Sequence, residues 1–79
     1  MWKLFLTAGH GRVLGMFTTE KLAEAAKLME MMDQLSEERA CREIEEEAAA
    51  EREYREVREI SDEELLDGLR DWYAVEYEA

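Results

Sequence analysis

The sequence predicts an α+β domain in which a small three-stranded antiparallel sheet carries about three helices, in the order ββααβα. Two short apolar runs, "WKLFLT" and "RVLGMF", flank the glycine-containing turn "AGHG". A long region rich in alanine and glutamate follows, and "SDEE" then opens a last helix. A hairpin, helical segments and one returning strand are typical of a sheet with helices packed on it. The 79 residues suffice for one small domain, 1–79.

The two apolar runs predict strands over about Trp2–Thr7 and Arg12–Phe17. Gly9 and Gly11 lie on either side of His10 and supply the positive φ that a tight hairpin turn requires. Both runs carry apolar residues on each face, so we expect one face of the sheet to meet helices.

A first helix is predicted from an N-cap at Thr18 or Thr19 to about Leu35. Its apolar residues recur at helical spacing and form one stripe, which we expect to be core: Leu22, Ala25, Ala26, Met29 and Met32. Met31 falls on the opposite side.

A second helix is predicted from a cap at Ser36 to about Ala50. Its narrow stripe of small apolar residues consists of Ala40, Cys41, Ile44 and Ala48. The next position of this stripe is Glu51, so we expect the packed part to end just before it.

The segment Tyr54–Ile60 is ambiguous, because Tyr54, Val57 and Ile60 have helical spacing but are out of phase with Ile44. We predict a third strand here, with a helix as the alternative. Ser61 then caps the last helix, and Glu64 is at the position of a capping box. Its expected apolar face contains Leu65, Leu66, Leu69, Trp72 and Tyr73.

The net charge of −11 lies entirely in one half of the chain. Residues 1–35 carry four bases and four acids, whereas residues 36–79 carry six arginines and 17 acids. An acidic field of this kind repels nucleic acids and anionic membranes and favours basic partners. We therefore expect no direct nucleic-acid binding and no membrane association.

The residues needed for catalysis or metal binding are scarce. The single histidine, His10, belongs to a glycine turn, and the single cysteine, Cys41, belongs to an apolar stripe where we expect it to be buried. We predict no enzyme, metal site or cofactor, and a lone cysteine is typical of a reducing, intracellular environment.

The acids of the last helix form the first candidate partner-binding site. Glu63, Asp67 and Asp71 make a column at intervals of four residues, rising about 6 Å per step, with Glu64 beside it. Such like-charge pairs oppose helix formation, so the column is a candidate imitation of DNA phosphates. A surface that only confers solubility is the alternative.

The second helix supplies a further candidate set of partner-binding acids, opposite its apolar stripe: Glu38, Glu45, Glu46 and Glu53. Arg39 and Arg42 share this face and are spaced along the helix so that they can form ion pairs with its glutamates. This arrangement is typical of an exposed helical surface.

Two resemblances suggest a function. The stretch "FLTAGHGRVLGMFTTEKLAEAA" followed by "YREVREI" resembles small phage-encoded proteins with a hairpin, a helix and a returning strand. The whole chain is similar to the small acidic anti-CRISPR proteins of phages and mobile elements, in particular those that inhibit type I-C effector complexes (Cascade).

The second resemblance implies a monomeric inhibitor in the cytoplasm of the bacterial host, which binds the basic DNA-binding surface of a Cas effector protein as a DNA mimic. The alternative function is an acidic adaptor or regulatory domain that binds another basic protein or a second copy of itself.

Overall fold

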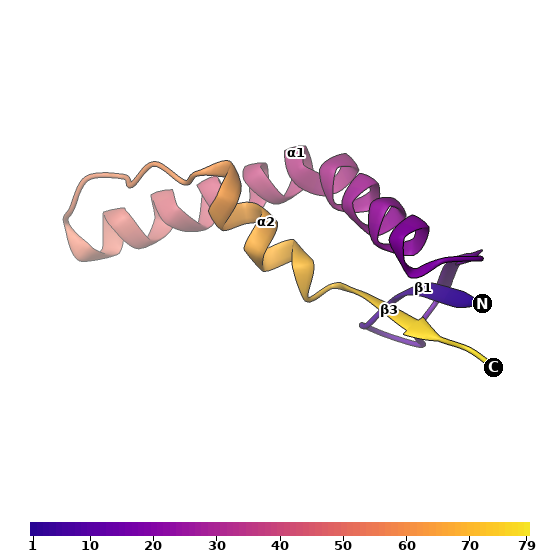
Figure 1. The fold of residues 1–79 in the computed structure, drawn as a ribbon. Helices are drawn as coiled ribbons and strands as arrows, with labels where there is room; N and C mark the ends of the chain where they lie inside the picture. Colours follow the sequence, from indigo (N-terminus) through magenta and orange to yellow (C-terminus); the bar gives the residue numbers. More distant parts are fainter.

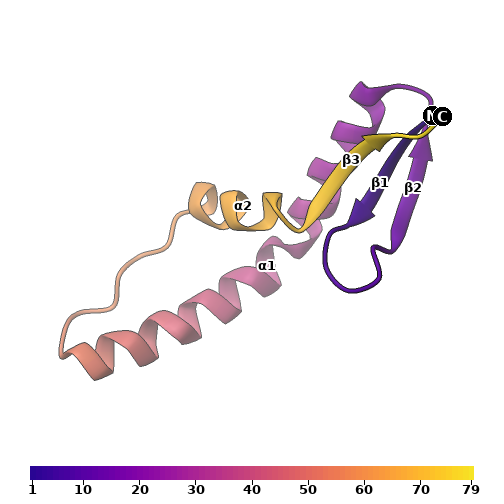
Figure 2. The ribbon, with the colours of Figure 1, turned by 90° about the horizontal axis from the view of Figure 1, so that it is seen from below.

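The computed structural model describes all residues, 1–79, and has the predicted α+β class with two helices instead of three. Its elements are β1 (Trp2–Leu6), β2 (Val13–Phe17), α1 (Glu20–Glu53), α2 (Asp62–Arg70) and β3 (Tyr73–Tyr77). The three strands form one antiparallel sheet in the order β2-β1-β3. The sheet lies at one end of the molecule in Figure 1, and its three strands are seen side by side in Figure 2. The observed order is thus ββααβ, not ββααβα.

The hairpin between β1 and β2 confirms the first two predicted strands. Gly9 and Gly11 both have φ of 67°, which is the left-handed conformation that glycine adopts without steric cost. Trp2 pairs with Phe17, and the register shifts between Leu4 and Phe5, where β2 has one extra residue. This irregularity is a β-bulge.

The prediction of a strand at Tyr54–Ile60 was wrong. This segment contains no strand, and β3 lies at Tyr73–Tyr77, where Leu6 pairs with Tyr73 and Trp2 with Tyr77. The alternation of aromatic and β-branched residues in "YAVEY" suits a strand next to β1. Assigning Trp72 and Tyr73 to the face of the last helix had concealed that alternation.

The two helices predicted over the middle of the chain are one continuous helix of 34 residues, α1. Thr19 caps its beginning as predicted, because its Oγ1 accepts a hydrogen bond of 3.2 Å from the backbone N–H of Leu22. Ser36 does not begin a new helix. A serine within a helix costs only a few tenths of a kcal/mol, and strong helix formers surround it without glycine or proline.

The core is small and joins the sheet to both helices. Leu4, Met31, Leu69 and Tyr73 form its buried cluster. Leu65 of α2 is also buried, as predicted, whereas Trp72 is exposed. On α1 the predicted phase was wrong: Met31 is 3% exposed, and Met29 is 70% exposed.

The molecule is long and thin, measuring 53 × 23 × 14 Å. The sheet lies at one end with both termini beside each other, and α1 leaves it in a curve toward the other end (Figure 2). The N-terminal amine donates a hydrogen bond of 2.9 Å to the carbonyl oxygen of Glu78. Residues 54–61 return along α1 to α2 (Figures 1 and 2). Neither helix combines the length and the hydropathy that crossing a membrane requires.

Candidate interaction surface

The second half of α1 turns its charged face inward and its apolar face outward, which is the reverse of the prediction. Arg39, Arg42 and Glu46 are half-buried against α2 and the returning segment 54–61. The apolar stripe of Ala40, Cys41, Ile44 and Ala48 is exposed, and Ile44 retains 67% of its accessible surface. The predicted burial of Cys41 was therefore wrong.

Glu46 holds the returning segment to α1. Its carboxylate pairs with the guanidinium of Arg55 and accepts a hydrogen bond of 3.0 Å from the backbone N–H of Arg58. These donors, Arg55 first and the Arg58 amide second, lower the pKa of Glu46 to about 2. Arg55 also pairs with Glu53, and both carboxylates raise the pKa of its guanidinium. The charge of Glu46 is thus compensated inside the molecule.

Glu64 has the equivalent role at the beginning of α2. Both its oxygens accept hydrogen bonds of 2.9 Å from Arg58, and Arg42 reaches it at 3.4 Å. The bonds from Arg58 lower the pKa of the Glu64 carboxyl. Ser61 caps α2 as predicted, accepting a hydrogen bond of 3.2 Å from the N–H of Glu64. The Glu64 side chain, however, faces the arginines, so the capping box is not reciprocal.

Arg39 completes this network. It pairs with the carboxylate of Asp62, donates a hydrogen bond of 2.9 Å to the carbonyl oxygen of Ile60, and lies 3.6 Å from Glu43. Segment 54–61 and the first turn of α2 are therefore attached to α1 largely through arginines, with Ile60 and Ala50 as buried apolar residues.

The predicted column on α2 remains on the surface. Glu63 and Asp71 are exposed and have no ion pair, whereas Asp67 lies 3.1 Å from Arg70. Asp71 is the C-cap residue, and its carbonyl oxygen accepts a hydrogen bond of 2.7 Å from the hydroxyl of Thr7. Its carboxylate is therefore placed at the junction with the sheet.

The predicted acids of α1 differ among themselves. Glu45 is exposed and unpaired, and Glu53 is exposed but pairs with Arg55. The side chain of Glu38 is only 18% exposed and lies 3.9 Å from Arg42. Of the eight predicted acids, Glu45, Glu63 and Asp71 alone are both exposed and free of ion pairs.

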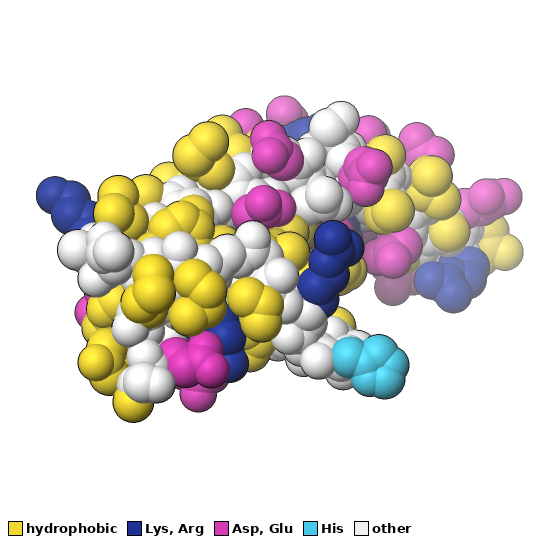
Figure 3. All heavy atoms as spheres, turned by 90° about the vertical axis from the view of Figure 1, so that its right-hand side faces the viewer, with side chains coloured by type: hydrophobic (Ala, Val, Ile, Leu, Met, Phe, Trp, Pro, Cys, Tyr) yellow, Lys and Arg dark blue, Asp and Glu magenta, His cyan; other side chains and the backbone are white.

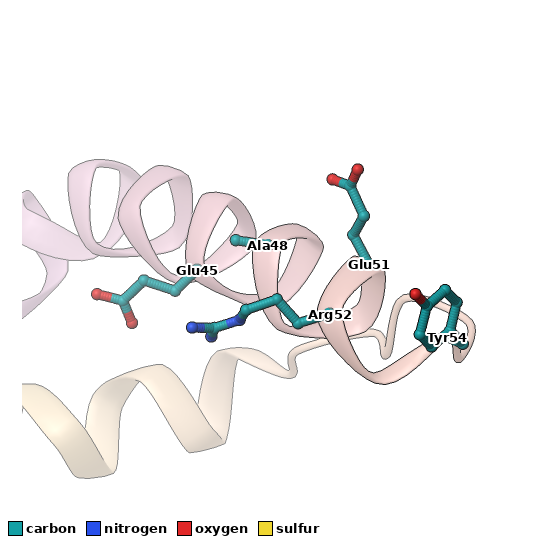
Figure 4. Close-up of a pocket in the computed structure, with 5 residues that line it drawn as sticks. All are labelled: Glu45, Ala48, Glu51, Arg52 and Tyr54. Carbon is teal, nitrogen blue, oxygen red and sulfur yellow. The ribbon is translucent and has the colours of Figure 1, made fainter.

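A second acidic column was missed because the prediction divided α1 and ended it near Ala50. Glu43, Glu47 and Glu51 are exposed and lie four residues apart on one continuous helix. In Figure 4, Glu51 extends away from the side of α1 along which the returning segment and α2 lie, while Arg52 extends along the helix toward Glu45. Regular spacing of glutamates across residues 43–51 was the signal that could have revealed this column.

Ten of the 17 acids in residues 36–79 have no ion pair, although five of the six arginines there do. The unpaired acids are Glu37, Glu45, Glu47, Glu51, Glu56, Glu59, Glu63, Asp71, Glu76 and Glu78. Seen from the sheet end, hydrophobic side chains gather on the near face and acidic ones are prominent on the more distant part (Figure 3). The surface field is therefore acidic over α1 and α2.

The fold and this surface define an elongated α+β protein with an acidic arm, residues 36–71, which comprises the second half of α1, the returning segment and α2. No family model, curated protein or solved structure matches the chain.

Proposed function

We propose that this protein is a non-enzymatic inhibitor of a type I CRISPR effector complex, of the I-C subtype, in the cytoplasm of a bacterial host. In this proposal a monomer binds the basic DNA-binding surface of a Cas protein through its acidic arm. The arm imitates DNA and thereby blocks binding of the target DNA.

One observation carries the proposal: five of the six arginines of the acidic arm pair with acids of the arm itself, and unpaired carboxylates remain on its surface. Arg39, Arg42 and Arg58 compensate acids inside the fold. The unpaired carboxylates of Glu47 and Glu51 then lie about 6 Å apart along α1. Those of Glu63 and Asp71 lie about 12 Å apart along α2. A channel that binds DNA is lined with Lys and Arg, and such an arm can displace its counterions as DNA does.

A competition experiment tests this function. The protein is titrated into a purified type I-C effector complex with labelled target DNA, and both protein binding and DNA binding are measured. We expect saturable binding that excludes DNA and weakens steeply with salt. Binding to the complex without loss of DNA binding would retain an inhibitor but reject DNA mimicry.

Two charge-reversal variants test which column matters. Glu63→Lys with Asp71→Lys alters the α2 column, and Glu47→Lys with Glu51→Lys alters the α1 column by the same charge. All four carboxylates are exposed and unpaired, so the fold should tolerate either change. We expect the α2 variant to lose inhibition more strongly; equal losses would indicate unspecific attraction to a basic surface. Glu46 is unsuitable for this comparison because its carboxylate is internal.

The adaptor function remains a second candidate because α1 leaves an apolar face exposed, which imitation of DNA alone does not require. In that case the same arm would bind a basic protein outside CRISPR systems, and the competition experiment would show no binding to the effector complex.

A further inference from the structure

We propose that the outer face of α1 is a docking face for a protein with an apolar groove bordered by basic side chains. This inference rests on the proposed function and adds an apolar contact to it, beside the acid column of α1. The outer face is defined by its exposed residues: Leu22, Ala25, Met29, Met32, Ser36, Ala40, Ile44 and Ala48.

The outer face is continuous. Its members follow one another at intervals of three or four residues, the spacing that places side chains on one side of a helix. All but Ser36 are apolar, and the face extends over about 39 Å of helix from Leu22 to Ala48. It runs on the same helix through both the neutral and the acidic half of the chain.

The fold itself gives this face no role. The sheet and α2 pack on the opposite side of α1, where Ala23, Met31 and Ala50 are buried. The most apolar stripe of the longest helix is thus left to solvent, while Arg39 and Arg42 occupy the internal side. Contiguous exposed apolar surface of this kind marks a site of protein interaction.

The elongated chain exposes more accessible surface than a compact monomer of its mass. A compact monomer of 9.3 kDa exposes about 5,000 Å². This chain exposes 5988 Å². The excess of about 1,000 Å² is comparable to the roughly 800 Å² that each partner contributes to a standard protein interface.

The charges beside the outer face select the kind of partner. Asp33, Glu37, Glu47 and Glu51 are exposed on α1 close to the stripe and have no ion pairs. A second copy of the chain carries the same net charge of −11 and would bring acids toward acids. A groove with Lys and Arg at its rim complements both the apolar stripe and its acidic border, as in the binding of amphipathic helices by grooves.

The experiment compares two double variants that remove equal numbers of exposed apolar side chains. Met29→Ala with Ile44→Ala truncates the outer face and preserves helix propensity. Met16→Ala with Val57→Ala truncates exposed residues of β2 and the returning segment. Affinity for the purified type I-C effector complex and the melting temperature are measured for both and for the wild type.

We expect the outer-face variant to bind about 10-fold or more weakly at an unchanged melting temperature, and the control variant to bind within about 3-fold of the wild type. If the wild type binds the complex and competes with DNA, two results would overturn the docking face: an unchanged affinity of the outer-face variant, or equal losses of affinity in both variants. Either result would leave the proposed function standing. A wild type that does not bind the complex overturns both. Concentration-dependent dimers in light scattering that disappear with the outer-face variant would assign the face to a second copy and also overturn the proposal.

Discussion

The methionines of α1 show how the position of a residue around a helix decides whether its side chain is buried. Met31 contacts the buried cluster that includes Leu4, Leu69 and Tyr73, whereas Met29 lies two residues earlier and projects into solvent. We predict that Met31→Ala lowers the free energy of unfolding by about 2–4 kcal/mol, through lost burial and the cavity that remains. Met29→Ala should change it by no more than about 0.5 kcal/mol. Chemical denaturation of both variants measures the difference, and comparable losses would contradict the observed helix phase.

Sequence periodicity identified the helix but not which of its faces is buried. The stripe through Leu22, Met29 and Met32 is the most apolar one, and hydrophobicity alone therefore selects it. The observed inner face includes Met31 but also Arg39 and Arg42, whose burial depends on carboxylates from residues 62–64. Such compensation between distant segments is absent from a local pattern.

Tyr54 occupies a backbone conformation that favours glycine. It ends α1 with φ of 54° and ψ of 43°, and the residue is 97% exposed. The N–H of Arg55 donates a hydrogen bond of 3.0 Å to the carbonyl oxygen of Ala50, and the N–H of Tyr54 donates one to the carbonyl oxygen of Glu51. These two hydrogen bonds form a Schellman motif. A non-glycine residue in this left-handed conformation is strained, and an exposed ring recovers little of that cost.

We predict that Tyr54→Gly stabilises the end of α1 by roughly 0.5–1 kcal/mol, the relief of strain less the greater entropy of glycine in the unfolded chain. Hydrogen exchange of the amides in residues 50–55 is the appropriate measurement, because the effect is local. Tyr54→Ala retains the strain and serves as the control. Faster exchange in the glycine variant would show that the tyrosine ring stabilises the helix end.

At the scale of elements, the returning segment 54–61 is attached to α1 by ion pairs instead of strand pairing. Glu46 and Glu64 have lowered pKa values because Arg55 and Arg58 stabilise their charged forms. A carboxyl whose pKa is lower in the folded state contributes stability above its unfolded pKa, and that contribution is lost as the pH falls through the folded pKa. For Glu46 this range extends from 4.5 down to about 2.

We therefore predict that the segment detaches progressively as the pH falls from about 4.5 to 2. The amide of Arg58, which donates to Glu46, reports this locally by NMR chemical shift. A local measurement is needed because other carboxyls also become protonated in this range and relieve repulsion. In Glu46→Gln the pH-dependent change in the chemical shift of this amide should be largely absent. An unchanged pH dependence would mean that another group causes the shift.

Element boundaries could be predicted where a local signal exists and not elsewhere. Thr19, Ser61 and the two glycines of the hairpin act on their nearest neighbours, and each was placed correctly. Ser36 has the chemistry of a cap but lies within a long run of helix formers, so the helix continues. The third strand depends on pairing with β1 more than 60 residues away. Both "YREVREI" and "YAVEY" contain aromatic and β-branched residues, so the local pattern offered two candidate segments for it.

At the scale of the molecule, the location of the charge could be derived fully from the sequence, whereas its exposure could not. The 17 acids of residues 36–79 were evident from composition. Which of them are free depends on Arg55 and Arg58, which reach Glu46 and Glu64 only because the segment folds back on α1. The candidate site therefore retains Glu63, Asp71 and Glu45 as free acids and gains the α1 column.

The excess of negative charge should make stability depend on salt. Glu47 and Glu51 lie about one helical turn apart, and Glu63 and Asp71 about two turns, on a molecule 53 Å long. The paired groups of Arg58 and Glu64, in contrast, are 2.9 Å apart. At about 0.3 M NaCl the Debye length lies between about 3 and 10 Å. Salt of this concentration screens the repulsion between turns and between helices more than it weakens ion pairs in direct contact.

We predict that the melting temperature rises by a few degrees, about 2–6 °C, between low salt and 0.3 M NaCl, as measured by circular dichroism. Glu47→Gln with Glu51→Gln removes two unpaired charges without touching the network, so this variant should melt higher at low salt and respond less to added salt. A flat or falling curve for the wild type would mean that the arginine network outweighs the net repulsion. The stability of the acidic arm would then depend mainly on the ion pairs of Arg39, Arg42, Arg55 and Arg58. Added salt weakens such ion pairs by screening their charges.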